Sequence, residues 1–269
     1  MLHPLSIHLI SRKIAAGLAA LFIPCQQSGQ AEYVYQAEEM LERGNGLIVL
    51  MNHFSLRDPL QVTSWLFRNK VTGRRPITAP VAYHRHDLLL RFLCYLMAIE
   101  TYPIATLKTI RLGYDVPERG AAVRAYLESA VSALEAGSIL FIAPQGGRKS
   151  CLREPVGHPV GSIISLARQK RVHNFGILIL GLSVPGVTSY DQASVRGLNV
   201  FRKYGLNVSY PYRADEAVEL AGGVDSVDTW IFGKMAELLP ATYGNLQIEP
   251  TADVDLDRSA PAVEKTTAS

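Results

Sequence analysis

The sequence lacks any long uninterrupted apolar run, and it also has few charged residues. Charged side chains make up 19% of the 269 residues and hydrophobic ones 48%, which is an apolar composition for a soluble enzyme. The absence of repeated long apolar runs excludes a multi-span membrane protein. A formal net charge of only +3 gives no reason to expect nucleic acid as a partner. A protein that rests on a bilayer surface fits this combination.

Cysteine is scarce as well. The three cysteines, Cys25, Cys94 and Cys151, lie far apart and form no Cys-x-x-Cys pair. An odd number at such spacing indicates neither a disulfide framework nor a zinc site. We therefore expect no metal ion and a reducing, cytosolic setting.

Two stretches, residues 14–23 and 88–99, are apolar but shorter than the roughly 20 residues that a transmembrane helix needs. No small-x-small cleavage site follows the first stretch, so a signal peptide is not expected. It either lies in the membrane interface as an amphipathic helix or packs on the domain. We expect peripheral attachment to the cytoplasmic face of a membrane. Basic residues that could assist are Arg12, Lys13, Arg74 and Arg75.

Short apolar runs alternate with longer stretches of helical periodicity. This pattern is typical of an α/β fold with a mainly parallel central sheet flanked by helices. We predict strands at residues 47–51, 77–82, 139–143 and 177–182, and helices at residues 118–136, 163–170 and 226–239. Gly137 and Pro240 stand where they would end the first and last of these helices.

The chain is predicted to hold a single α/β domain over residues 31–249. Residues 1–30 form an N-terminal apolar helical segment, either interfacial or packed on the domain. Residues 250–269 are rich in Ala, Thr, Asp and Ser with few large apolar side chains. Such a segment cannot offset its ordering entropy by burial, so we predict a disordered tail.

The most informative segment is the apolar run at residues 47–51 followed by Asn-His-Phe-Ser-Leu-Arg-Asp-Pro at residues 52–59. Asp58 and Pro59 suit the start of a helix, because Asp is a favoured cap and proline is pre-shaped for the first turn. His53 then lies just beyond the carboxyl end of a strand, where open α/β sheets place their ligands. The turn can bring the carboxylate of Asp58 onto one imidazole nitrogen of His53.

Such a pair is suited to general base catalysis. The carboxylate fixes the tautomer of His53, and the other ring nitrogen can take a proton from a substrate hydroxyl. Two structural alternatives stay open at this point: His53 is an ordinary structural histidine, and Asp58 is only a helix cap.

A second apolar run, at residues 139–143, breaks into the loop Pro144, Gln145, Gly146, Gly147 and Arg148. Glycines let backbone N–H groups approach an anion, and arginine can bind phosphate through two hydrogen bonds. The loop therefore predicts a phosphate-binding site, with an ordinary surface turn as the alternative. It does not have the spacing of a nucleotide-binding P-loop.

These two segments resemble motifs of the glycerol-phosphate and lysophosphatidic acid acyltransferases, which use a His-x4-Asp pair. Asn52, His53, Ser55, Asp58 and Pro59 match the first motif. Pro144, Gly146 and Arg148 match a Phe-Pro-Glu-Gly-Thr-Arg-Ser motif, while Gln145 replaces its Glu and Gly147 its Thr. The resemblance implies that His53 deprotonates the acceptor hydroxyl and that Asp58 supports it. It also implies that Asn52, Ser55 and the 144–148 loop belong to the substrate site.

A third family segment, of the form Gly-x-x-Pro-x-x-Arg, is matched at Pro103 and Ile104, but Thr106 stands at the arginine position. Lys108 or Arg111 could replace that phosphate-binding arginine, and both could equally be solvated surface charges. Pro185 lies late for the family's proline after the next apolar strand. The resemblance covers roughly residues 34–244.

The resemblance implies an O-acyltransferase of phospholipid biosynthesis. It would move a fatty acyl group from a thioester, acyl-CoA or acyl carrier protein, to a hydroxyl of a glycerolipid, with 1-acylglycerol-3-phosphate as the expected acceptor. Neither a metal nor a bound cofactor is expected. Two alternatives remain: Thr106 and Gln145 favour an acceptor without phosphate, and a lipid-binding relative could have lost catalysis. A serine hydrolase is disfavoured, because the second glycine of residues 181–186 is one place too far for a nucleophile elbow.

Overall fold

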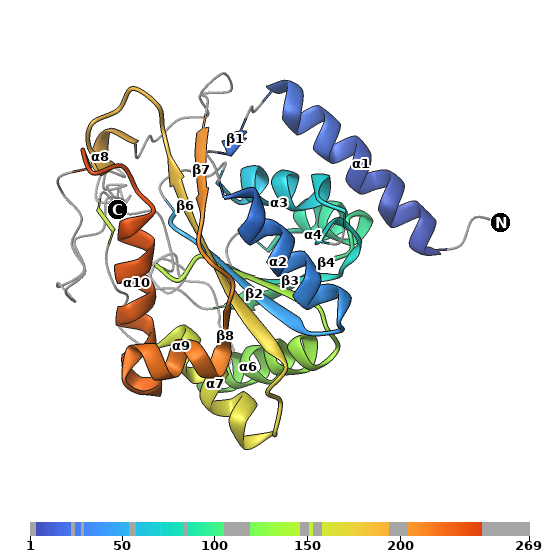
Figure 1. Ribbon diagram of the computed structural model, residues 1–269. Helices are drawn as coiled ribbons and strands as arrows, with labels where there is room; N and C mark the ends of the chain where they lie inside the picture. The colour runs from blue at the N-terminus through green and yellow to red at the C-terminus, as the bar shows by residue number, and fades with distance from the viewer. Residues whose placement is uncertain are drawn as a thin grey trace, which may run out of the picture.

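The computed structural model of the chain describes residues 4–22, 25–27, 30–53, 58–70, 72–82, 86–104, 119–145, 151–152, 158–193 and 204–243. Their eight strands form one sheet in the order β1-β7-β6-β2-β5-β3-β4, with β8 paired to β6 (Figure 1). Most of the paired strands are parallel, and among the described residues only the pairs β6–β7 and β6–β8 are antiparallel. The predicted α/β fold with a mainly parallel sheet, flanking helices and an N-terminal helix is confirmed.

The strands are β1 (Cys25–Gln27), β2 (Gly46–Met51), β3 (Ile77–Ala82), β4 (Ile99–Ile104), β5 (Ile139–Ile142), β6 (Phe175–Ser183), β7 (Tyr204–Val208) and β8 (Tyr212–Arg213). The α-helices are α1 (Pro4–Phe22), α2 (Ala31–Glu42), α3 (Asp58–Arg68), α4 (Leu88–Leu96), α6 (Arg119–Glu135), α7 (Pro159–Gln169), α8 (Tyr190–Ala193), α9 (Ala214–Ala221) and α10 (Val227–Glu237). Short 3-10 turns span η1 (Thr72–Arg74) and η3 (Val224–Ser226).

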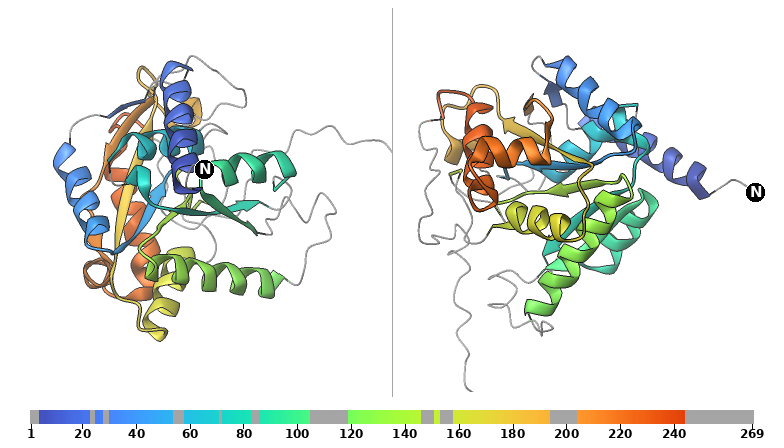
Figure 2. Two further views of the ribbon diagram at one scale, coloured as in Figure 1. Left: turned by 90° about the vertical axis from the view of Figure 1, so that its right-hand side faces the viewer. Right: turned by 60° about the horizontal axis from the view of Figure 1, so that its bottom comes forward.

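The central strands are apolar along their whole length because helices cover both faces of the sheet. Every residue of β2, β5 and β6 is buried, as expected for parallel strands in the middle of an α/β sheet. Helices α6 and α7 cover one face, and α2 and α3 cover the other, with α1 packed outside α3 (Figures 1 and 2). The sheet therefore holds the carboxyl end of β2 rigidly between β5 and β6.

Two glycines show how closely α6 packs. A side chain at Gly46 would come within 2.5 Å of the Leu134 carbonyl oxygen, so α6 can approach β2 only because this residue is glycine. Gly137 ends α6 with a φ of 69°, a left-handed conformation that glycine adopts without steric cost. The predicted end of this helix is thus confirmed.

Two expectations about the N-terminal part need correction. Strand β1 pairs with β7, so the sheet begins inside the segment that we assigned to residues 1–30. Arg12 is 2% exposed and its guanidinium donates to backbone carbonyls of other elements. It therefore holds α1 to the domain and cannot meet lipid head groups. Arg75 also bonds inward, to the carbonyl of Leu41.

Candidate active site

His53 lies just after the end of β2, at the carboxyl edge of the sheet. Strand β2 pairs in parallel with β5 on one side and with β6 on the other. Strand β5 lies between β2 and β3 in the sheet. The next strand in sequence, β6, lies on the other side of β2. Such a change in the direction of strand order opens a crevice at the carboxyl ends of the strands. The position predicted for His53 is confirmed.

The side chains of His53 and Asp58 form a pair. Nδ1 of His53 lies 3.1 Å from Oδ2 of Asp58. An ionised carboxylate can only accept, so Nδ1–H donates and Nε2 carries the lone pair that can take up a proton. The side chain of Asp58 is fully buried, while that of His53 is 15% exposed. The pair is therefore anchored on the inside and open on the side of His53.

Helix α3 begins at Asp58, which favours this arrangement. The N-terminal end of a helix carries a partial positive charge that stabilises a carboxylate in the first turn. Asp58, Gln61 and Val62 are all buried and follow the i, i+3, i+4 spacing of one helix face. The packing of α3 thus fixes the carboxylate, and the carboxylate in turn fixes the imidazole ring.

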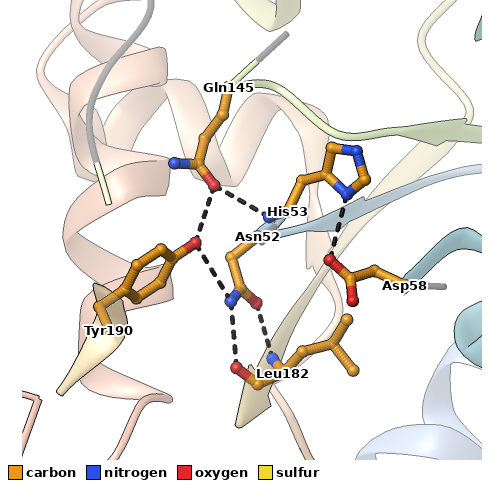
Figure 3. A network of polar contacts seen from close by, with 6 residues as sticks. All are labelled: Asn52, His53, Asp58, Gln145, Leu182 and Tyr190. Carbon is orange, nitrogen blue, oxygen red and sulfur yellow. Dashed lines mark hydrogen bonds and ion pairs between the residues drawn. The ribbon is translucent and has the colours of Figure 1, made fainter. Parts of the chain in front are cut away.

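Gln145, just beyond the end of β5, supports the backbone of His53 (Figure 3). Its Oε1 accepts hydrogen bonds from the backbone N–H of His53, at 2.9 Å, and from the hydroxyl of Tyr190, at 3.1 Å. Its Nε2 donates to the carbonyl of Cys151, at 3.1 Å. The side chain is only 3% exposed. An amide satisfies all three contacts, whereas a carboxylate would present an oxygen to the Cys151 carbonyl.

Asn52 and Tyr190 complete this network. Asn52 bonds both backbone groups of Leu182 in β6: Oδ1 accepts from its N–H at 2.7 Å and Nδ2 donates to its carbonyl at 3.0 Å. Nδ2 also lies 3.4 Å from the hydroxyl of Tyr190. Burial raises the pKa of the Tyr190 phenol far above its ordinary value, so the hydroxyl stays protonated and can donate to Gln145. The network ties the ends of β2, β5 and β6 together behind His53.

The predicted site residues differ in where the structure places them. His53, Asp58, Asn52 and Gln145 come together, and the sequence separates them by up to 93 positions. Asn52 and Gln145 form their hydrogen bonds with protein groups, so a contact with substrate stays a prediction. Pro144 lies in the turn after β5 and is buried. The remaining predicted residues lie outside the described ranges: Ser55, Thr106, Lys108, Arg111, Gly146, Gly147 and Arg148.

The segment with Pro103 and Ile104 forms the end of β4, the edge strand. Strands β5 and β3 separate β4 from β2, which is about 14 Å at the usual strand spacing. A phosphate-binding group that follows β4 would have to reach across this distance to act beside His53. The role of Lys108 or Arg111 therefore stays a prediction.

Sequence reasoning missed Tyr190, Leu182 as a partner, and the Cys151 carbonyl. Tyr190 lies 138 positions from Asn52 in sequence, in a four-residue helix without a motif or an apolar period. Leu182 contributes only backbone atoms, which carry no sequence signal. One sequence signal points to this network. Asn52 and Gln145 each follow an apolar strand, and a polar side chain that is buried there requires a hydrogen-bond partner.

The described residues bring together no group of three or more His, Cys, Asp or Glu side chains that could hold a metal ion. No model of a known protein family matches the chain, and comparison with curated proteins gives no match. The assignment of function therefore depends on the geometry around His53 and on the motif resemblance.

Proposed function

We propose that the protein is an O-acyltransferase that moves a fatty acyl group from a thioester, acyl-CoA or acyl carrier protein, to a hydroxyl of a glycerolipid. The observation that carries the proposal is the pair of His53 and Asp58, 3.1 Å apart at the carboxyl end of β2. The match of residues 52–59 to the His-x4-Asp motif supports the same reaction. The intact pairing of a base with its orienting carboxylate also argues against a binding protein that has lost catalysis, because binding alone does not require the pair.

The reaction follows from the chemistry of this pair. Nε2 of His53 removes the proton from the acceptor hydroxyl as its oxygen attacks the thioester carbonyl carbon. Asp58 stabilises the imidazolium that forms. The tetrahedral intermediate then collapses, the carbon–sulfur bond breaks, and Nε2–H returns the proton to the leaving thiolate. The products are an ester and a free thiol, and no metal or bound cofactor enters the scheme.

The expected acceptor is 1-acylglycerol-3-phosphate, with Arg148 as the predicted phosphate ligand. The neutral side chain of Gln145 had favoured an acceptor without phosphate. Its three internal hydrogen bonds weaken that argument, because an amide is what the Cys151 carbonyl and the two donors require. Thr106 remains the sequence feature in favour of the alternative acceptor.

A lipid acceptor calls for access to a membrane, and we propose peripheral attachment at the cytoplasmic face. Within the described residues, no helix combines the length and the apolar character needed to cross a bilayer. Of the basic residues expected to assist attachment, Lys13 has an exposed side chain on α1 and could meet anionic head groups. Arg74 is exposed as well, but it precedes β3 and lies at the edge of the sheet opposite His53.

A turnover assay tests the proposal. Purified protein is given acyl-CoA or acyl carrier protein with lysophosphatidic acid, and ester formation and thiol release are both measured. We expect transfer by the wild type and at least a ~10²-fold loss with His53→Ala. Thiol release without ester formation would mean hydrolysis, and the absence of both would refute the proposal.

The acceptor is tested with Arg148→Ala. Loss of one charge-assisted contact should raise the acceptor KM by about 10-fold or more and leave the KM of the donor nearly unchanged. Arg148→Lys should restore only part, since lysine does not reproduce the two-pronged geometry. Equal rates with lysophosphatidic acid and an uncharged monoacylglycerol, in wild type and Arg148→Ala alike, would favour the acceptor without phosphate.

A further inference from the structure

Helix α4 exposes an unusual amount of apolar side chain. Five of its nine residues are large, apolar and exposed, and the fraction exposed is 80% for Leu88, 68% for Leu89, 58% for Phe92, 44% for Leu93 and 70% for Tyr95. The other large exposed apolar side chains of the described residues are spread over α1, α2, α3, α6, α9 and the turn before β8. A contiguous apolar face of this kind marks an interaction site.

Helix α1 lies beside α4 and is locked in place. The Arg12 guanidinium donates to the carbonyls of Gly73 and Arg75, each at 2.8 Å, and to those of Met97 at 2.7 Å and Ala98 at 3.1 Å. His8 adds an edge-on ring contact with Tyr95. Because Met97 and Ala98 directly follow α4, these bonds hold the two helices as one block (Figure 2, left). The apolar face is therefore preformed.

The charged side chains that α1 and α4 expose are basic, and one exposed acidic residue, Asp87, lies just before α4. Neither α1 nor α4 contains an acidic residue, while Lys13 and Arg91 are exposed on them. The carboxylate of Asp87, just before α4, accepts from the N–H of Leu90 at 2.7 Å and so caps the helix. Exposed Ile10 and Ile14 on α1 are four positions apart, on one face of that helix. Apolar and aromatic side chains beside basic groups are typical of helices that lie in a lipid interface.

We propose that the exposed face of α4, together with Ile10 and Ile14, docks on a membrane that contains anionic lipids. Helix α4 starts after the carboxyl end of β3, and β3 and β2 both run parallel to β5. The start of α4 therefore lies at the same edge of the sheet as His53. Docking would bring this edge to the lipid surface. Only that consequence, delivery of a lipid acceptor, rests on the proposed function; the binding itself does not.

The test is flotation of the full chain with vesicles of phosphatidylcholine, with and without phosphatidylglycerol. We expect salt-sensitive binding that is stronger on the anionic vesicles. The double variant Leu89→Asp, Phe92→Asp should lower the partition coefficient by at least about 10-fold. A matched control is the double variant Val123→Asp, Leu220→Asp, on α6 and α9, which adds the same charge at side chains that are 42% and 55% exposed. It should stay within about 2-fold of the wild type. Circular dichroism and thermal unfolding verify that each variant is folded.

Three results would overturn the proposal. One is wild-type protein that does not float at low salt, and another is an α4 variant that floats as well as the wild type. The third is a dimeric wild type with a monomeric α4 variant that binds vesicles equally well. The exposed face of α4 would then be a contact between two copies of the chain. His53→Ala should float normally. Flotation without any acyl transfer would refute the proposed function alone, and transfer to a detergent-solubilised acceptor without flotation would refute the docking alone.

Discussion

The ends of β2 and β5 look alike in sequence but differ in the structure. Each strand is fully buried and each ends in a polar turn at the same edge of the sheet. After β2, the side chain of His53 is 15% exposed and holds one ring nitrogen on Asp58. After β5, Gln145 is 3% exposed and bonds His53, Tyr190 and Cys151 inside the protein.

This difference separates a residue that can react from one that holds it in place. His53 reaches the surface, so its replacement should remove chemistry and leave the fold. Gln145 is enclosed, so its replacement should first lower stability and affect activity only through the position of His53. If this difference holds, variants at the end of β2 should mainly lower activity, and variants at the end of β5 should mainly lower stability.

The largest effect is expected for His53→Ala, with a loss of at least ~10²-fold in kcat for the proposed acyl transfer, because this variant removes the proposed base. The change in the free energy of unfolding should be within about 1 kcal/mol, since the side chain is partly exposed. Stopped assays of ester formation and urea unfolding measure the two quantities. A folded variant with near-normal turnover would end the assignment of His53 as the base.

A smaller loss, about 10- to 10²-fold in kcat, is expected for Asp58→Asn. In the proposed mechanism the charge of Asp58 stabilises the imidazolium; the variant removes that charge, although its amide oxygen can still accept from Nδ1–H. Asp228→Asn is the matched control. That carboxylate is equally buried and accepts from the N–H groups of Val160 and Gly161 at the start of α7, at 3.1 and 2.8 Å. Asp228→Asn should lower the free energy of unfolding, while the folded variant keeps its kcat. Equal losses of kcat in Asp58→Asn and Asp228→Asn would mean that the role of Asp58 is structural only.

The sequence predicted much of this fold because its signals are local. The apolar runs of β2, β5 and β6 and the period of α6 record burial along consecutive residues. Strands β1, β4, β7 and β8 were not predicted. Strands β1 and β8 have only three and two residues, β7 is a short strand antiparallel to β6, and β4 contains Pro103, which an edge strand tolerates. The pair of His53 and Asp58 was predictable because one turn joins them. The contacts of Tyr190 and Gln145 were not, because they depend on how three strands align in space.

Gln145→Leu should lower the free energy of unfolding by about 2–4 kcal/mol, since it leaves the N–H of His53, the hydroxyl of Tyr190 and the Cys151 carbonyl without this partner. Gln61→Leu is a control of the same chemistry. Gln61 is 1% exposed, and no hydrogen-bond partner of its amide is found among the described residues. Its replacement should be neutral or stabilising. Urea unfolding measures the free energy of unfolding of both variants. Similar decreases in the two would show that the hydrogen bonds of Gln145 do not contribute to stability beyond the burial of an amide.

The smallest effect is expected for Tyr190→Phe, which removes the hydroxyl donor to Gln145 but leaves the His53 N–H in place. At pH 7 the loss of stability should be about 1 kcal/mol and the loss of kcat a few-fold. Tyr126→Phe is the control, because that buried hydroxyl has no hydrogen-bond partner among the described residues and its loss should not change kcat.

The two tyrosine variants should show the same change in the pH dependence of stability at alkaline pH. Burial raises the pKa of both phenols, so above the ordinary tyrosine pKa of about 10 the unfolded chain loses a proton that the folded chain keeps. Stability therefore falls with rising pH, by about 1.4 kcal/mol per pH unit for each such tyrosine. Either variant should lose less stability than the wild type between about pH 9 and pH 11, by roughly that amount per unit above pH 10. If both variants flatten the alkaline fall but only Tyr190→Phe lowers kcat, the hydroxyl of Tyr190 acts through Gln145 on His53. If Tyr190→Phe has the same kcat as Tyr126→Phe, the hydroxyl of Tyr190 has no role in positioning His53.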